Sequence, residues 1–379
     1  MNLRIPHAAL TLAAAILLAA NALAAEFKHP GLINSAGRLN VLSRLEKDAR
    51  SSDRRQAYYA SLDKDRRFSA DYQPRPMDYV VVVARTSNES EKRFRNDMAA
   101  AYFTALRWVK TGDNRYRAKS IEIMNAWADK FVALTREKGT KTGPGQIPLE
   151  AAWAIPIWAN AAEIILYYKH PYGAPGPEWK DKDVRKFRAF LGRLHEQRQE
   201  MRRNRSDNQG VSGALADMTL GVFNNDERLY RAGLREAQRQ LPEIVADDGE
   251  VKELRDRDCV HPQYSLIGLT QAAQIEMNQS GRSTLLSMRH KGDIQPILME
   301  GIEYMSRALT DGSEARDCRT GRLLDGYAPM AKRLYANDNK VQAKKLNGAM
   351  DRVQQRMSGL FPEGTEFTHG DDGSQSAGP

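Results

Sequence analysis

The stretch RDRDCVHPQYS, residues 255–265, concentrates ionisable side chains to a degree that a purely structural segment rarely needs. A histidine and a tyrosine can exchange protons with a substrate, and an arginine beside them can stabilise developing negative charge. The candidates for such acid–base chemistry are Arg257, His261 and Tyr264, with Arg255 as a further cation. The alternatives are an arginine that only pairs with a neighbouring aspartate, a surface or capping histidine, and a tyrosine that packs in the core.

A second polar segment, RSDNQGVSGAL, begins at Arg205 and leads into an apolar run. Asn208 lies where the polar loop turns into a helix, so spacing alone favours a helix N-cap for this residue. A carboxamide can instead donate its N–H groups to a carboxylate, and Gln209 beside it could add another donor. The two polar segments are therefore the candidate chemical parts of the chain.

The elements that must position these residues are predicted to be helices. Apolar residues recur at spacings of three and four over 90–113, 114–134, 148–168 and 183–205. Further helices are predicted at 208–223, 226–245, 263–279, 292–309 and 341–358. The main strand signal is DYVVVVA at 78–84, which we expect to be a short extended stretch. Helix pairs joined by brief polar loops predict an all-α solenoid or closed helical ring.

The two ends of the chain differ in composition from its interior. Residues 1–25 have an arginine, an apolar stretch and a small-residue cleavage pattern, which together are typical of a secretory signal peptide. We therefore expect a periplasmic or secreted protein. No later stretch approaches 18 uninterrupted apolar residues, which predicts no stable membrane insertion. Residues 26–369 are predicted to form a single domain, and 370–379 a disordered polar tail.

Net charge and cysteine content limit the partners of the chain. The formal net charge is +9 over 379 residues, which makes an anionic partner plausible, although a basic surface without a ligand is the alternative. Outside the cytoplasm an acidic polysaccharide or a membrane surface fits better than nucleic acid, because the basic helix at 182–205 carries no recognised nucleic-acid-binding motif. Cys259 and Cys318 could form a disulfide. They belong to no metal-binding motif, so we predict neither a metal nor a cofactor.

Four motifs together resemble the alginate lyase family, whose members are secreted polysaccharide lyases built as an incomplete (α/α) toroid. In chain order they are GDNRYRAKSIEIMNAWA, EAAWAIPIWANAAEIIL, DNQGVSGAL and the sequence from DGEVKELRDRD through HPQYSLIGLTQAAQI, and the similarity covers roughly residues 80–310. The family's catalytic set is an Asn-His pair at a helix start, then an arginine and a tyrosine seven residues apart. Asn208, Arg257 and Tyr264 match it. Gln209 stands where the family has histidine, and His261 is a candidate replacement.

The resemblance implies an all-α toroid of antiparallel helix pairs that carries out β-elimination on a uronic-acid polymer. Asn208 and Arg257 would stabilise the sugar carboxylate as the C5 proton leaves. A nearby cation favours a phenolate, and Arg257 is the expected supplier for Tyr264. In mannuronate and glucuronate the C5 proton and the C4 oxygen lie on one side of the ring, so Tyr264 could serve as both base and acid, assisted by His261. In guluronate they lie on opposite faces, and His261 would be the base.

Other residues are candidates for holding the polymer. The resemblance at EAAW makes Trp153 a candidate platform for a sugar face, although core packing is the default for a tryptophan on a helix. Arg205 and Arg255 could contact flanking uronates, or belong to a solvated basic face. Asn88 lies near the start of a family-like helix and could line the cleft.

Three functions follow from these observations. The first is a polysaccharide lyase acting on alginate, polymannuronate or glucuronan. The second is a glycoside hydrolase on a similar helical toroid, which would need two carboxyl groups facing across the glycosidic bond. The third is a non-catalytic periplasmic protein that binds polyuronate.

Overall fold

The computed structural model describes seven stretches of the chain. These are residues 26–44, 53–84, 88–137, 142–173, 175–201, 205–336 and 355–370. The predicted signal peptide at 1–25 and the predicted tail, apart from Gly370, lie outside them.

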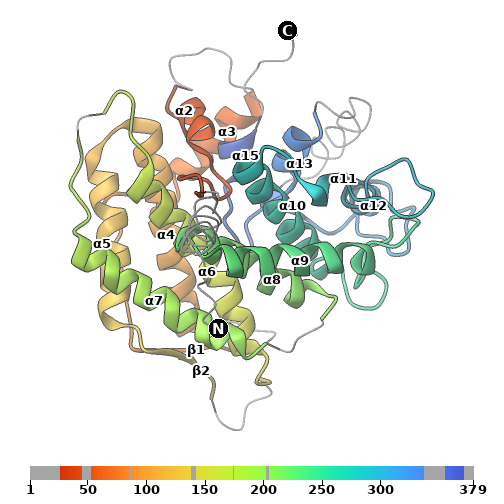
Figure 1. Cartoon of the computed structure of the whole chain (residues 1–379), viewed down its shortest axis with the longest axis horizontal. Coiled ribbons are helices and arrows are strands. Elements are labelled where there is room, and N and C mark those ends of the chain that lie inside the picture. Colours follow the sequence, from red (N-terminus) through yellow and green to blue (C-terminus); the bar gives the residue numbers. More distant parts are fainter. Residues whose placement is uncertain are drawn as a thin grey trace, which may run out of the picture.

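Seven long helices in two layers form the body of the molecule (Figure 1). They are α4 (Glu89–Thr111), α5 (Asn114–Lys130), α6 (Gln146–Tyr167), α7 (Asp181–Gln199), α8 (Asn208–Phe223), α9 (Glu227–Ile244) and α10 (His261–Ser280). The helices α4, α6, α8 and α10 pack on one another in sequence, and α5, α7 and α9 each pack against the preceding helix of that inner row. The predicted incomplete (α/α) toroid of antiparallel helix pairs is confirmed.

Short elements from both ends of the chain fill the gap between α10 and α4. They are α2 (Ala36–Arg44), α3 (Asp53–Asp63), the 3₁₀ helix η2 (Arg66–Phe68), α13 (Ala328–Leu334) and α15 (Thr365–His369). Helix α2 packs on α4, α15 packs on α2, α3 and α13, and α13 packs on α10, as their proximity in Figure 1 suggests. Helices α11 (Thr284–Ser287) and α12 (Ile297–Thr310) cover another side of α10.

The strands are short and lie in two parallel pairs. Strand β1 (Tyr79–Val81) pairs with β2 (Ala133–Thr135), so the predicted extended stretch at 78–84 is confirmed. Strand β3 (Leu323–Leu324) pairs with β4 (Gln355–Arg356), placing Arg356 opposite Leu324. The helix predicted at 341–358 is therefore wrong at its end, because residues 355 and 356 pair as a strand; residues 341–354 lie outside the described residues.

Two other predicted helix boundaries are wrong. The helix predicted at 183–205 ends at Gln199. The helix predicted at 292–309 begins only at Ile297, because Pro296 before it has an extended backbone with φ −68° and ψ 137°. The remaining long helices begin and end within a few residues of their predicted bounds.

Aromatic side chains pack the inner row of helices against the outer one. The rings of Trp158 and Phe190 meet edge to face with centroids 5.5 Å apart, and Trp127 and Phe94 extend the cluster to α5 and α4. Helix α6 is long and apolar enough to cross a membrane by length and composition alone, but 94% of its most apolar window is buried within the fold. Its composition is thus explained by its central position in the core.

Glycines bring α8 and α9 unusually close. A Cβ on Gly233 would lie 2.6 Å from the carbonyl oxygen of Ala214, and a Cβ on Gly221 would lie 2.4 Å from the backbone nitrogen of Tyr230. Because both nearest atoms belong to the backbone, neither position has room for a side chain. This contact fixes α8, whose first turn carries Asn208.

Candidate active site

The predicted catalytic residues come from the N-terminal ends of two adjacent inner helices. Asn208 is the first residue of α8, and His261 and Tyr264 lie in the first turn of α10. Arg257 lies in the turn-rich segment that precedes α10. Since α8 and α10 pack side by side, these residues, distant in sequence, share one end of the ring.

Glu253 joins Asn208 to Arg257. The Asn208 Nδ2 atom donates to both carboxylate oxygens of Glu253 at 2.9 Å, and the Asn208 backbone N–H donates to Oε2 at 3.1 Å. Arg257 Nη1 donates to Oε1 of the same carboxylate at 2.5 Å. The amide and the backbone N–H of the buried Asn208 are thus both directed at one carboxylate.

His261 continues this network on the other side of Arg257. Its Nδ1 lies 2.7 Å from Asp258 Oδ2, and its Nε2 lies 2.8 Å from Arg257 Nη2. A guanidinium can only donate, so Nε2 accepts and the proton resides on Nδ1. Asp258 also accepts the backbone N–H groups of His261 and Val260. Burial raises the pKa of Asp258, but these hydrogen bonds lower it more, so the pKa lies below its ordinary value. These hydrogen bonds hold the imidazole ring between Asp258 and Arg257 with its Nδ1 toward the carboxylate.

Tyr264 is held by aromatic neighbours beside this network. Its ring centroid lies 5.6 Å from that of His261, 6.0 Å from that of Trp153 and 5.9 Å from that of Phe361. Trp153 Nε1 donates to Ser212 Oγ at 3.1 Å, and this hydroxyl donates to the Asn208 carbonyl at 2.7 Å. Trp153 thus links the tyrosine to the start of α8, which favours a place at the site wall for this largely buried residue.

The cation expected to act on Tyr264 is a different arginine from the predicted one. Burial raises the pKa of Tyr264 to about 12, and Arg95 is the strongest influence in the opposite direction, with Arg356 acting the same way more weakly. Arg257, the expected supplier, is engaged with Glu253 and His261 instead. The positive charge near the phenol therefore comes from α4 and β4.

Arg95 is itself part of a buried group with two glutamates. Its Nε donates to Glu150 Oε1 at 2.8 Å, and its Nη2 donates to Glu150 Oε2 at 2.5 Å and to Glu91 Oε1 at 2.9 Å. Burial and the nearby Glu150 raise the pKa of Glu91 to about 7. The guanidinium lies 5.8 Å from the Trp153 ring centroid, so this group supports the site from beneath the tryptophan.

Two of the predicted substrate-binding residues, Asn88 and Arg205, make structural contacts within the fold. Asn88 caps α4, because its side chain accepts the Glu91 N–H and donates to the Val81 carbonyl. Arg205 pairs with Asp207 at the start of α8. A polymer-binding role for either residue stays a prediction.

Arg255 and Gln209 stay closer to the predicted site. Arg255 lies two residues before Arg257 in the chain. Its largely exposed side chain forms an ion pair with Glu250 at 2.6 Å. The part-exposed Gln209 follows Asn208, and its backbone N–H is bound by Asp207. The N-cap interpretation of Asn208 is wrong: Asp207 is the N-cap of α8 and accepts the N–H groups of Gln209 and Gly210.

A disulfide braces the segment that carries the candidate catalytic residues. Cys259 and Cys318 are bonded, with their Cα atoms 5.8 Å apart. Gln263 adds to the brace, because its Nε2 donates to the carbonyls of Cys259 and Arg322 at 2.6 and 3.0 Å. The segment that carries Arg257 and leads into α10 is thereby attached to the chain that follows α12.

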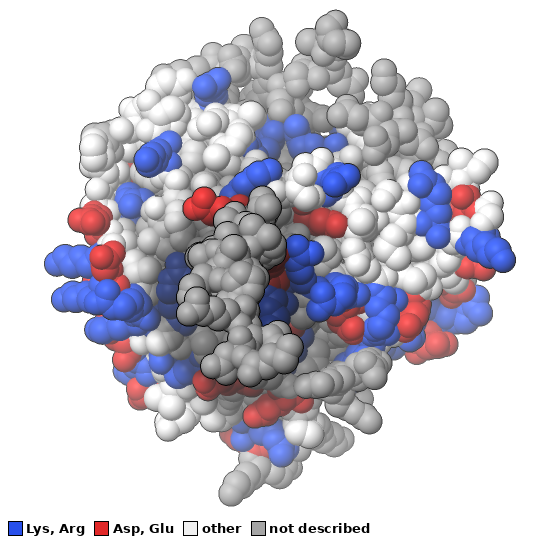
Figure 2. Space-filling model, in the orientation of Figure 1, with Lys and Arg blue, Asp and Glu red and all other residues white. Residues whose placement is uncertain are grey.

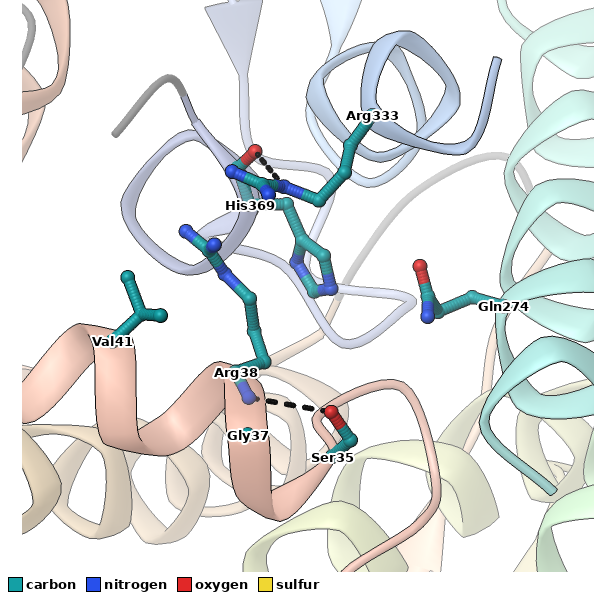
Figure 3. A pocket seen from close by; sticks show the side chains of 7 residues that line it. All are labelled: Ser35, Gly37, Arg38, Val41, Gln274, Arg333 and His369. Atoms are coloured by element: carbon teal, nitrogen blue, oxygen red, sulfur yellow. Dashed lines mark hydrogen bonds between the residues drawn. The ribbon is translucent and has the colours of Figure 1, made fainter. Parts of the chain in front are cut away.

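A separate pocket of about 290 Å³ lies near the other end of α10 (Figure 3). It is lined by Ser35, Gly37, Arg38, Val41, Gln274, Arg333 and His369. Arg333 and Arg38 donate to backbone carbonyls of residues 368–370, and the buried His369 ring contacts the Ile33 carbonyl. The polar side chains of this pocket are thus used to hold segments of the fold together. We therefore place the candidate active site at the opposite end of α10, which carries Tyr264.

Sequence reasoning missed the roles of Glu253, Arg95 and Phe361. Glu253 has φ +74°, a conformation that is uncommon outside glycine and that clusters at functional sites, but no sequence pattern marks it. Arg95 and Phe361 approach Tyr264 from α4 and from the chain beyond β4. Among the residues that the structure describes, no group of three His, Cys, Asp or Glu side chains could hold a metal ion.

Comparison with known proteins places this arrangement in a family. The model of the family described as alginate lyase matches residues 43–311. No curated protein sequence matches the chain. Alginate lyase A1-III from Sphingomonas species A1 is similar in structure, with a TM-score of 0.66, 15% identity, and coverage of 91% of this chain and 97% of that one.

Two further solved structures share this fold. A variant of alginate lyase A1-III complexed with tetrasaccharide has a TM-score of 0.66 at 15% identity, covering 92% of this chain and 97% of that one. An alginate lyase from Bacteroides ovatus has a TM-score of 0.66 at 11% identity, covering 90% of this chain and 99% of that one. At such identities the likeness shows the fold, and the family match carries the assignment. The chain belongs to the alginate lyase family and is a polysaccharide lyase.

Proposed function

We propose that this protein cleaves a uronic-acid polymer, polymannuronate or glucuronan, by β-elimination in the extracytoplasmic compartment that its predicted signal peptide implies. One observation carries the proposal. Asn208, Glu253, Arg257, His261 and Asp258 form a continuous hydrogen-bonded row, and Tyr264 stands beside it.

The row can stabilise charge on the sugar carboxylate. Arg257 uses one N–H of Nη1 for Glu253 and one of Nη2 for His261, which leaves further donors, and its side chain is 43% exposed. We propose that the amide of the buried Asn208, which also binds Glu253, contributes a second donor. Directed donors of this kind gain strength as the carboxylate takes up charge when the C5 proton leaves.

Tyr264 then supplies the proton transfers. Its phenolate takes the C5 proton, the freed electron pair forms the C4–C5 double bond, and the bond from C4 to the glycosidic oxygen breaks. The same phenol returns a proton to the departing oxygen. The products are an unsaturated uronate end and a new non-modified chain end, with no water consumed.

The tautomer of His261 supports a one-residue mechanism. Its Nε2 lone pair is bound by Arg257 and its Nδ1 proton by Asp258, so neither nitrogen is free to take the C5 proton. A single acid–base group suits mannuronate and glucuronate, where proton and leaving oxygen lie on one side of the ring. We therefore propose these uronates rather than guluronate as the substrate.

The glycoside hydrolase alternative has little support at this site. It needs one carboxyl group to protonate the leaving oxygen and another to act as base or nucleophile. The nearby carboxylates, Glu253 and Asp258, are bound to Asn208, Arg257 and His261. Both carboxylates therefore position neighbouring side chains rather than act as the acid or the base.

The test follows absorbance in the near ultraviolet, where the unsaturated product absorbs, during incubation with polymannuronate, polyguluronate and glucuronan. We expect turnover on polymannuronate or glucuronan. Tyr264→Phe should reduce kcat at least about 100-fold, the scale of a lost general acid–base group, while polymer affinity stays within a few-fold. Tyr79→Phe, at an exposed tyrosine on β1, is the matched control. Polymer binding without turnover by the parent would support the non-catalytic binder instead.

A further inference from the structure

The chain beyond the family match contributes a wall to the candidate site. Residues 357–363 follow β4, and the Phe361 ring packs near Tyr264. Buried Glu363 fixes this stretch by accepting the Gly359 N–H at 3.0 Å and the Ser358 hydroxyl at 2.7 Å. The wall is therefore an ordered part of the fold.

Strand β4 is tied to the first turn of α10 through its partner strand. The Leu324 N–H donates to Gln263 Oε1 at 2.8 Å, and Gln263 directly precedes Tyr264. Arg356 pairs with Leu324 across the two strands. This register places Arg356 beside the tyrosine, and its charge lowers the pKa of the phenol.

The rest of the site offers little net positive charge to an anionic polymer. Arg257 lies between Glu253 and the Asp258–His261 pair, so its guanidinium is accompanied by two carboxylates. Arg95 is bound by Glu150 and also by Glu91. A polymer with a carboxylate on every sugar needs a further cation here.

Arg356 meets this need. Its side chain is exposed, and the structure gives its guanidinium no hydrogen bond or ion pair with any described residue. The neighbouring basic groups at the site all have carboxylate partners. An unpaired guanidinium can bind a carboxylate with two parallel N–H bonds at no cost of breaking an existing ion pair.

We propose that Arg356 binds the carboxylate of the uronate adjacent to the one that is cleaved, and thereby selects polymers charged on consecutive sugars. The inference rests on the proposed lyase function. The cleaved sugar's own carboxylate faces Asn208 and Arg257, whereas Arg356 reaches the polymer from β4, on a different segment beside Tyr264.

The test compares steady-state kinetics of the full chain, Arg356→Gln and Arg356→Lys on polymannuronate. We expect Arg356→Gln to raise KM roughly tenfold, the scale of one charge-assisted hydrogen bond, with kcat changed less than about threefold. Arg356→Lys should recover part of the loss. Arg185→Gln, at an exposed arginine on α7, should match the parent.

A second substrate separates carboxylate recognition from a general effect of charge. On mannuronate oligomers whose carboxylates flanking the cleaved residue are methyl esters, the parent should lose its advantage over Arg356→Gln. Equal KM values for the two proteins on polymannuronate, or an unchanged advantage on the esters, would overturn the inference and leave the lyase proposal standing. A parent that cleaves no polyuronate would overturn both.

Discussion

At the scale of single residues, the site depends on one carboxylate that orients two donors. Glu253 binds the Asn208 amide and the Arg257 guanidinium at once, from a backbone conformation with φ +74°. Such a conformation persists only where surrounding contacts over-determine it. We infer that its role is to set the directions of the two groups for which we propose contact with the substrate carboxylate.

Glu253→Ala should therefore reduce kcat/KM by about 100-fold, because it frees Asn208 and Arg257 together and removes about 2–3 kcal/mol of charge-assisted bonding. Glu253→Gln, which keeps the side-chain length and one acceptor, should lose less. Steady-state kinetics on polymannuronate give both values. Glu250→Gln is the control, since that carboxylate pairs with Arg255. Full activity of the Glu253→Ala variant would show that Glu253 is not needed to orient Asn208 and Arg257.

The pKa of Tyr264 predicts an alkaline activity profile. Burial raises this pKa to about 12, so below that pH the phenolate fraction grows tenfold with each pH unit. We expect kcat/KM to rise with this slope from neutral pH until the protein unfolds, measured on polymannuronate at constant ionic strength. A plateau beginning near pH 7 would instead indicate an imidazole as the base.

The residues of the site were predictable only where chain order carries the pattern. The seven-residue spacing of Arg257 and Tyr264, with Asn208 at a helix start, can be read from the sequence. Glu253 could not be chosen among the carboxylates around it, because its role comes from a backbone conformation. Arg95 acts on Tyr264 through packing between helices, which no local pattern records.

At the scale of elements, α4 and α6 are joined beneath the site by an ionic group with an excess of carboxylates. Arg95 bridges Glu91 on its own helix and Glu150 on α6. Burial disfavours the ionised form of Glu91, and the like charge of Glu150 adds to this effect, so the pKa of Glu91 rises to about 7. The group therefore makes the packing of these two helices dependent on pH.

Glu91→Gln should stabilise the protein above neutral pH. The folded chain holds a proton on Glu91 up to about pH 7, whereas the unfolded chain releases it near the ordinary value of 4.5. Stability is thus fully present below that value and falls as pH rises through about 7. We expect a gain of about 2 kcal/mol at pH 8 and none at pH 4, measured by urea unfolding.

Glu89→Gln, at an exposed position in the first turn of α4, is the control for the Glu91 variant. A gain at pH 8 that is equal for both variants would show that the effect comes from surface charge. A loss of stability in Glu91→Gln would show that the bond to Arg95 outweighs the repulsion from Glu150.

The disulfide links two further elements, the start of α10 and the segment after α12. The bond closes a loop with a sequence separation of 59 residues. The double variant Cys259→Ser, Cys318→Ser should lose about 2–4 kcal/mol in the free energy of unfolding. It should also lower kcat, because Arg257 and His261 flank Cys259 in sequence. Unfolding curves and kinetics of parent and variant, with and without reductant, check this; a parent insensitive to reductant in both measurements would contradict it.

At the scale of the whole molecule, the ring of long helices was predictable and its closure was not. The long helices carry an apolar periodicity that the sequence displays. The short elements that bridge α10 and α4 become stable only through distant partners: Arg55, for example, donates to the Phe367 carbonyl from 312 residues away. Helices of three to eleven residues are marginal alone, so their sequences give little signal.

Charge is distributed over the outer surface in mixed groups. On the face shown in Figure 2, basic side chains gather near α7 and α9 with acidic ones among them. The formal net charge of +9 therefore does not reduce to one continuous basic track on that face. This distribution is why we assign polymer recognition to individual arginines at the site.

The site draws on residues that span most of the chain, from Arg95 through Trp153 and Asn208 to Phe361. No fragment that ends before Phe361 contains a complete set of these groups. Catalysis should consequently be the last property gained as the chain matures, after the helices are formed and the ring is joined. The chain would have no catalytic activity until the segment that carries Phe361 had docked, which makes turnover a stricter measure of correct assembly than helix content.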